Sequence, residues 1–209
     1  MKKLSLICML VMVIFINMNH VQAEEYTNYQ EILFEDDSVI LLKSYSSKDF
    51  KTYYKKTKRS KMFGWRIYVV HKNEPLDFIA ETKIKIYNSG TTAITHNIEL
   101  ESEETYKKQI SASGEIKVKG SGSKKKFKGS VDSSIKASVT TTSTKSSSES
   151  YDFNIKVDPR TYVSIVIRGT GEINNGVGSY YFFWIRTKKG GWETFTVMTE
   201  YYEIIKERF

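Results

Sequence analysis

Alternation of apolar and polar residues with a period of two is the dominant pattern of the chain. Between residues 82 and 87, Ile84 and Ile86 fall on one face, while lysine and tyrosine fall on the other. A turn at 88–90 follows, and residues 93–100 carry the chain back. Because successive side chains of a β-strand point to opposite faces, this pattern indicates strands with one buried face.

The remainder of the chain supports the same fold class. Val163, Ile165 and Ile167 alternate with other residues and predict a further buried strand. Helical stripes are scarce, the sequence has only two prolines, and β-formers such as Thr, Tyr, Ile and Val are common. Glycine-rich residues 169–178 predict a loop, and residues 188–191 predict a turn. The sequence therefore predicts a mainly β protein of elongated antiparallel sheets or a β-sandwich.

Residues 110–139 have the composition of a linker, because Ser, Lys, Gly and Thr dominate them. Their phase indicates strands instead. Even positions are apolar or small up to residue 122, and odd positions take over after the lysines at 124–126. These alternate positions carry Ile110, Ala112, Gly114, Ile116, Val118, Phe127, Gly129, Val131, Ile135, Ala137 and Val139. We therefore expect one long amphipathic hairpin with a turn rich in glycine and lysine.

The expected hairpin suits a membrane better than a soluble core. Its apolar face is thin, whereas a β-sandwich needs larger side chains between its sheets. A barrel strand in a membrane needs about 9–11 residues, with one face compatible with lipid and one with water. Closure of several copies into a ring pairs every backbone N–H and C=O. The hairpin tip either docks on anionic head groups or ends in water on the far side; it consists of Lys124, Lys125 and Lys126.

Two further segments are rich in aromatic residues. Residues 46–61 contain six lysines and one arginine, and they predict a solvated loop, a surface helix or a surface-docking loop. A docking loop would present Tyr53, Tyr54, Lys55, Lys56 and Arg59 to a head group or a sugar. Residues 180–185 are highly apolar but too short to span a membrane. We expect a central strand there, with an aromatic belt that faces a partner or lipid as the alternative.

A family resemblance follows from the middle of the chain. A Thr/Ser-rich stretch at 140–150 comes after the expected hairpin, and residues 151–163 then include the step Tyr151-x-Phe153 and the turn Asp158-Pro159. These features resemble the aerolysin-type β-pore-forming proteins, with the epsilon toxin and mosquitocidal toxin branch nearest. The resemblance covers residues 82–195. It implies an elongated, aerolysin-like module that forms a homo-oligomer and converts its hairpin into a transmembrane β-barrel.

The N-terminus has the features of a secretory signal peptide. Lys2 and Lys3 precede an apolar run of about 13 residues, which is shorter than the roughly 20 that a membrane-spanning helix needs. The residues before the bond after Ala23 suit signal peptidase, so we expect cleavage there and secretion. Cleavage removes Cys8, the single cysteine, and with it any disulfide. We expect a signal peptide at 1–23, a small surface-binding region at 24–81 and a pore-forming-like module at 82–209.

The charge of the chain favours anionic partners. The formal net charge is +8, and it becomes about +6 when Lys2 and Lys3 leave with the signal peptide. The basic excess lies mainly in residues 48–61 and 117–128, which favours the head groups of an anionic membrane or wall polymers. No nucleic-acid-binding motif is present, so we expect no nucleic-acid partner.

The residues typical of catalytic and metal sites are few. After cleavage the histidines are His71 and His96, and neither has a second histidine or a carboxylate at ligand spacing. The pair Asp36–Asp37 is adjacent in sequence, so its side chains would point to opposite faces of a strand. No nucleophile-elbow motif is present. We expect no enzyme activity, no bound metal and no cofactor.

Three functions fit these patterns. The leading hypothesis is a secreted, aerolysin-like toxin that assembles on a target membrane and inserts residues 110–139. One alternative is a secreted, non-enzymatic β-sandwich that binds a cell-surface polymer or protein, and another is a matrix protein that self-associates. The leading hypothesis depends on residues 110–139 forming paired strands, because a coiled or helical segment would remove its basis.

Overall fold

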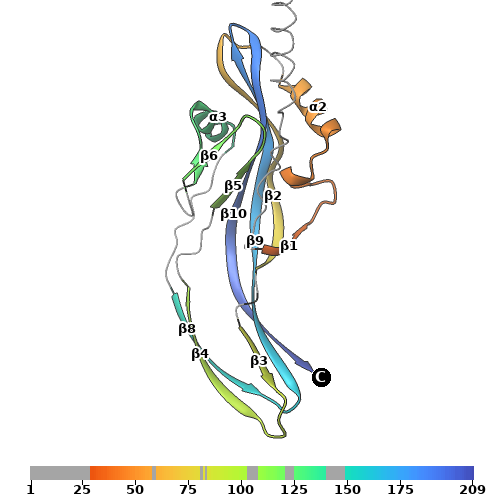
Figure 1. Cartoon of the computed structure of the whole chain (residues 1–209), viewed down its shortest axis with the longest axis vertical. Coiled ribbons are helices and arrows are strands. Elements are labelled where there is room, and N and C mark those ends of the chain that lie inside the picture. Colours follow the sequence, from red (N-terminus) through yellow and green to blue (C-terminus); the bar gives the residue numbers. More distant parts are fainter. Residues whose placement is uncertain are drawn as a thin grey trace, which may run out of the picture.

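The computed structural model describes residues 29–57, 60–80, 82, 84–102, 108–120, 125–139 and 149–209. The molecule is elongated and mainly β, and its described strands pair antiparallel, which confirms the predicted fold class (Figure 1). The strands are β1 (Tyr29–Phe34), β2 (Phe63–Ala80), β3 (Ile84–Asn88), β4 (Ile94–Ser102), β5 (Lys108–Ala112), β6 (Val118–Lys119), β7 (Lys126–Phe127), β8 (Glu149–Val157), β9 (Thr161–Phe182) and β10 (Ile185–Arg208). The helical elements are η1 (Leu42–Ser44), α2 (Ser47–Lys56) and α3 (Ser130–Ser138).

A hairpin of β9 and β10 forms the long axis of the molecule (Figure 1). The main sheet has the order β1-β2-β9-β10-β5, and β3 joins β9 beyond the end of β2. Phe183 and Trp184 form the two-residue turn of the hairpin with φ values of 44° and 63°. Positive φ at both turn residues matches the twist of the flanking strands, but it is rare for aromatic residues.

Glycine in β9 makes room for the aromatic core beside it. A Cβ at Gly171 would lie 2.6 Å from Cε2 of Phe195. Phe195 meets Phe78 of β2 edge to face, with 5.7 Å between ring centroids. The predicted loop at 169–178 and the predicted turn at 188–191 are therefore wrong, since both lie within long paired strands. Glycine here reflects close packing between strands, and it does not break them.

A second sheet, β4 with β8, packs on β3, β9 and β10 near the C-terminus (Figure 1). Its interface is built from β-branched residues: Ile84, Ile94, Ile155, Val157, Val163 and Ile165. The strands predicted at 82–87 and 93–100 are present, but they join different sheets. Asn88, at the end of β3, connects the two sheets. Its Nδ2 donates to the carbonyl oxygen of Thr92, in the turn before β4, and to that of Val157 in β8.

The main sheet crosses the expected boundary at residue 81. β1 pairs with β2, and β2 pairs with β9, so residues on both sides of the boundary share one sheet. The expected signal peptide and its cleavage site at Ala23 lie outside the described residues.

The long hairpin expected at 110–139 is not what this structure contains. β5 pairs with β10, β6 pairs with β7 over two residues, and residues 130–138 form α3. The reason lies in the spacing of Val131, Ile135 and Val139. Steps of four positions share one face of a strand and also fall close to one face of a helix. Alternation alone therefore could not separate the two conformations.

Candidate functional site

Residues 113–139 are called here the covering segment, and its described residues, 113–120 and 125–139, lie as a layer over one face of the main sheet (Figure 1). Their apolar side chains meet Trp65 of β2 and Trp192 of β10 in one buried cluster. The members from the covering segment are Ile116, Phe127, Val131, Ile135 and Val139. Residues 121–124 lie outside the described residues, and with them the expected tip residue Lys124.

The predicted membrane-inserting residues fall into distinct environments in this structure. The buried ones are Ile110, Ile116, Phe127, Val131, Ile135 and Val139. Ala112 and Val118 are half-buried, while Gly114, Gly129 and Ala137 are exposed. The expected tip residues Lys125 and Lys126 are also exposed. The structure thus buries most of the larger apolar residues and leaves Gly114, Gly129 and Ala137 at the surface.

The covering segment is hydrogen-bonded to the main sheet at its start. The backbone N–H of Ser113 donates to the carbonyl of Gly191 over 3.0 Å, and that of Glu115 donates to the carbonyl of Lys189 over 2.9 Å. Farther along, the loop and cap backbone hydrogen bonds within the described part of the segment are internal, as between Lys128 N–H and the Lys117 carbonyl at 2.7 Å. Side-chain packing therefore provides most of the contact between this later part and the sheet.

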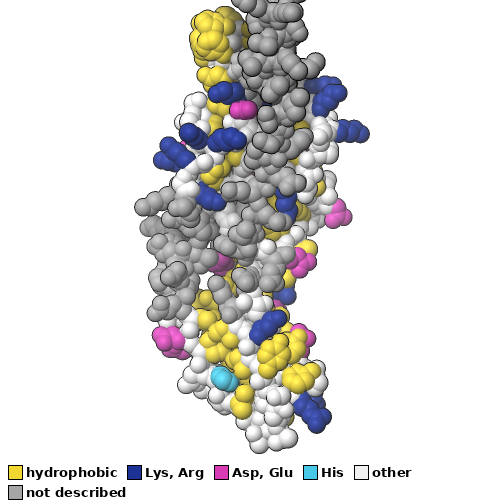
Figure 2. Space-filling model, viewed as in Figure 1, with side chains coloured by type: hydrophobic (Ala, Val, Ile, Leu, Met, Phe, Trp, Pro, Cys, Tyr) yellow, Lys and Arg dark blue, Asp and Glu magenta, His cyan; other side chains and the backbone are white. Residues whose placement is uncertain are grey.

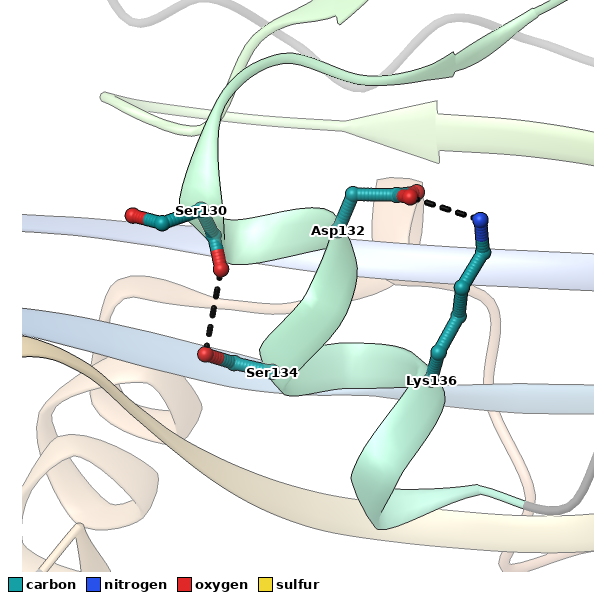
Figure 3. A network of polar contacts seen from close by, with 4 residues as sticks. All are labelled: Ser130, Asp132, Ser134 and Lys136. Carbon is teal, nitrogen blue, oxygen red and sulfur yellow. Dashed lines mark hydrogen bonds and ion pairs between the residues drawn. The ribbon is translucent and has the colours of Figure 1, made fainter.

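Helix α3 has little intrinsic stability. It is nine residues long, four of them serine, and its N-cap Gly129 forms no side-chain cap. Lys136 bridges Asp132 at 2.7 Å, and Ser134 Oγ donates to the carbonyl of Ser130 (Figure 3). Serine and β-branched residues are modest helix formers, and helices this short are marginal alone. The burial of its apolar side chains on the sheet therefore maintains this helix.

Residues 47–56 form helix α2, which confirms the surface-helix interpretation of this basic region. A capping box starts it: the Ser46 hydroxyl accepts from the N–H of Asp49, and the Asp49 carboxylate accepts from the N–H of Ser46. Both bonds satisfy donors that a helix start leaves open. The helix presents a basic surface made of the exposed side chains Lys48, Lys51, Lys55 and Lys56.

The two tyrosines predicted to bind a surface pack inward from α2. Tyr53 contacts the ring of Tyr68 with 6.3 Å between centroids, and Tyr54 stacks on Phe50 at 5.8 Å. Burial raises the pKa of Tyr54 to about 12. These rings hold α2 to the sheet, whereas Lys55 and Lys56 remain exposed. Arg59 lies outside the described residues.

Six large apolar side chains gather at the turn of the β9–β10 hairpin. This distal aromatic cluster consists of Met62, Phe63, Phe182, Phe183, Trp184 and Ile185. Trp184 is 58% exposed and Ile185 is 69% exposed, although Phe63, Phe182 and Phe183 contact one another at 4.8–5.2 Å between centroids. Figure 2 shows this hydrophobic surface at one end of the molecule, with basic side chains next to it.

The central strand expected at 180–185 is therefore wrong. Residues 180–182 end β9, residues 183–184 turn, and Ile185 begins β10. No Gly, Asn or Asp marks this turn, so the residues that usually signal a tight hairpin were missing. The alternative expectation, an outward-facing aromatic belt, agrees with the exposure of these side chains.

The side chains of His, Cys, Asp and Glu are those that most often bind a metal or act in catalysis. Among the described residues, no three of these side chains group closely enough to hold a metal ion. His71 Nε2 is buried without a hydrogen-bond partner in the part of the chain that the structure describes. Burial lowers the pKa of His71, which favours the neutral imidazole. No helix within the described ranges is both long and apolar enough to cross a membrane.

Comparison with known proteins gives only distant similarities. No family model and no curated protein matches the chain. The Cry23Aa1 and Cry37Aa1 binary protein complex contains a chain that is 9% identical, with 76% of this chain and 87% of that chain covered and a TM-score of 0.26. Lamprey immune protein is 10% identical, with 76% and 51% covered and a TM-score of 0.21. This chain thus spans about half the length of the lamprey protein, and similarities of this size carry no argument about function.

Proposed function

We propose that the protein is a secreted β-pore-forming protein whose covering segment leaves the main sheet and inserts into a target membrane as paired strands. One observation carries the proposal: the covering segment is a separate layer. The pairing of β2, β9, β10 and β5 does not involve residues 117–120 or 125–139, which are the described residues of this stretch. The strand pairing of the sheet therefore remains when this layer moves, and the hydrogen bonds that would break include those of Ser113 and Glu115 to β10.

The sequence of the covering segment suits both conformations. Val131, Ile135 and Val139 stay on one face in a helix and in a strand. In a strand, the exposed Ala137 and Ser133 join that same face, and the lysines and most serines fall on the other. The rearrangement thus converts a helix that depends on burial into an amphipathic strand whose apolar face suits lipid.

Release of the covering segment also favours assembly. It uncovers Trp65, Trp192 and Ile110, which are buried beneath it. Large exposed apolar patches promote protein association, and a ring of copies would cover this one. An isolated hairpin in lipid leaves backbone groups unpaired, so insertion requires several copies. The proposed assembly is therefore a homo-oligomer. Neither assembly nor insertion of the segment requires enzyme activity or a cofactor.

A pair of lysine substitutions tests the proposal. Ala137 and Ser130 are both exposed in this structure, so neither change disturbs the folded protein strongly. In the inserted strand, residue 137 faces lipid and residue 130 faces water. A lysine at the lipid face costs about 2–4 kcal/mol at the bilayer midplane. We expect Ala137→Lys to abolish dye release from liposomes, while Ser130→Lys releases dye as the unchanged protein does.

Equal dye release by the two variants would contradict insertion of this strand. Thermal unfolding of both variants serves as the control for folding. If the unchanged protein releases no dye from any vesicle and remains monomeric, the alternative applies: a secreted, non-enzymatic β-sandwich that binds a cell-surface polymer or protein. Polymer that sediments without lipid would instead favour the matrix function.

A further inference from the structure

We infer that the distal aromatic cluster is a docking site for anionic phospholipid bilayers, in which Trp184 and its neighbours enter the interfacial region of the membrane. The inference rests on the proposed function only for the choice of a membrane as partner. It concerns a different part of the chain, at the turn of the β9–β10 hairpin, and it holds whether or not the covering segment inserts.

The side chains of the distal aromatic cluster are exposed. A soluble protein usually places phenylalanine and tryptophan in its core, yet here they project from the end of the longest hairpin. The backbone also adopts an uncommon conformation to present them, since Phe183 and Trp184 both have positive φ. Backbone strain of this kind often accompanies function. If these two positions contributed only to the stability of the sheet, Asn-Gly would be the more favourable pair.

Ring contacts and a backbone hydrogen bond hold the distal aromatic cluster in place. The ring of Phe63, from the start of β2, contacts those of Phe182 and Phe183, which also contact each other. The N–H of Trp184 donates to the carbonyl of Lys61 over 3.2 Å, which ties the turn to the chain before β2. A preformed apolar tip enters an interface without first ordering its side chains, so less conformational entropy is lost on docking.

The surface next to the distal aromatic cluster is rich in basic residues. Residues 57–73 and 173–192, which carry the cluster, contain no Asp or Glu. Arg186, Lys188 and Lys189 are exposed at the start of β10. Helix α2 adds its lysines beside them, because Arg186 Nη1 donates to the Tyr54 carbonyl at 3.4 Å and Lys189 Nζ lies 5.4 Å from the Tyr54 ring. These basic side chains, called here the basic collar, therefore lie next to the apolar tip, with Glu115 as an acidic neighbour because its N–H donates to the Lys189 carbonyl.

This combination favours lipid over a protein partner. Aromatic rings are enriched both in protein–protein interfaces and at bilayer surfaces, but lysine is depleted in protein–protein interfaces and is attracted to anionic head groups. Anionic head groups attract basic residues near the membrane plane, and aromatic rings occupy the boundary between head groups and acyl chains. The basic collar would therefore meet the head groups, and the distal aromatic cluster would reach the boundary between head groups and acyl chains.

The tryptophans of the chain make a direct test possible. Of the three, Trp65 and Trp192 are buried and Trp184 is exposed. The experiment uses the chain that starts after Ala23, so that the apolar run near the N-terminus adds no binding of its own. We expect its emission to shift to the blue on vesicles that contain phosphatidylserine, with quenching by brominated lipid. Trp184→Phe should keep the binding and lose most of the shift.

Co-sedimentation with vesicles measures the docking. We expect Phe183→Ser combined with Trp184→Ser to weaken binding by at least about tenfold. The matched control is Tyr87→Ser combined with Tyr201→Ser, two exposed rings near the other end of the molecule, which should bind normally. Lys188→Glu with Lys189→Glu should weaken binding in low salt, and vesicles of phosphatidylcholine alone should bind poorly.

Several results would overturn the inference. These are a lack of vesicle binding, equal binding of the double serine variant and its control, equal binding to neutral and anionic vesicles, or binding without a change in Trp184 emission. The two proposals fail separately. Ala137→Lys should bind vesicles normally without leakage, whereas loss of the distal aromatic cluster should remove binding itself.

Discussion

Glu193, in the middle of β10, accepts a hydrogen bond of 2.6 Å from the backbone N–H of Leu42, and both residues are about 2% exposed. Asn175 of β9 donates to the same carboxylate at 3.1 Å and to the carbonyl of Ile40 at 2.8 Å. Tyr45 completes the group by donating to Asn175 Oδ1 at 2.6 Å. This buried network fixes the chain before α2, and hence the basic helix, to the main sheet.

Glu193→Ala should lower the free energy of unfolding by about 1–3 kcal/mol, because it leaves the Leu42 N–H buried without this acceptor. Chemical denaturation measures the loss. Hydrogen exchange should show faster opening of residues 36–57. The control Glu115→Ala removes an exposed carboxylate and should have little effect. Unchanged exchange in the Glu193 variant would show that other contacts hold this segment.

Ile135→Ala should loosen the covering segment. Ile135 is 2% exposed and packs in the cluster with Trp65 and Trp192, so its truncation leaves a cavity that costs about 2–5 kcal/mol. We expect a red shift of tryptophan emission and faster hydrogen exchange in α3. Ala137→Ser changes an exposed residue of the same helix and should change neither quantity. If both variants behave alike, burial of this face does not stabilise α3.

Gly171→Ala should destabilise the main sheet, because its Cβ would lie 2.6 Å from Phe195 Cε2 and 2.8 Å from the Thr196 carbonyl oxygen. Overpacking of this kind costs about 1–3 kcal/mol. Phe195→Leu removes the ring and should relieve part of the penalty in the double variant, so the two effects should not add. Strict additivity in urea unfolding would show that the ring is not the obstacle.

His71 should make stability depend on pH. Burial lowers the pKa of its imidazole in the folded protein, while Glu74 and Asp36 partly oppose the shift. The unfolded chain then binds the proton near its ordinary pKa of about 6.5, before the folded chain does. The stability due to neutral His71 is complete above that pH and is lost as the pH falls towards the lowered pKa. The urea midpoint should therefore be lower at the acidic end of this pH range than at its upper end, and His71→Gln should reduce that difference. An unchanged difference would show that other groups cause the pH dependence.

Local pattern accounts for much of the sheet. The alternation at Ile84, Ile86 and residues 163–167 reappears as β3 and β9, because a period of two requires only that one face be buried. The basic region at 46–61 also yields a surface helix, whose start is encoded locally by Ser46 and Asp49.

The sequence by itself determined a mainly β chain and a middle segment with two unlike faces, because these follow from spacing between near neighbours. For residues 46–61 it allowed a surface helix as one of three alternatives. Only the tertiary structure decided that residues 130–138 are helical, that glycine-rich 169–178 is a strand and that Phe183 and Trp184 turn the longest hairpin. In each case a distant contact made the choice. Trp65 and Trp192 shelter the apolar face of α3, Phe195 occupies the space that Gly171 leaves, and pairing along β9 and β10 imposes the aromatic turn.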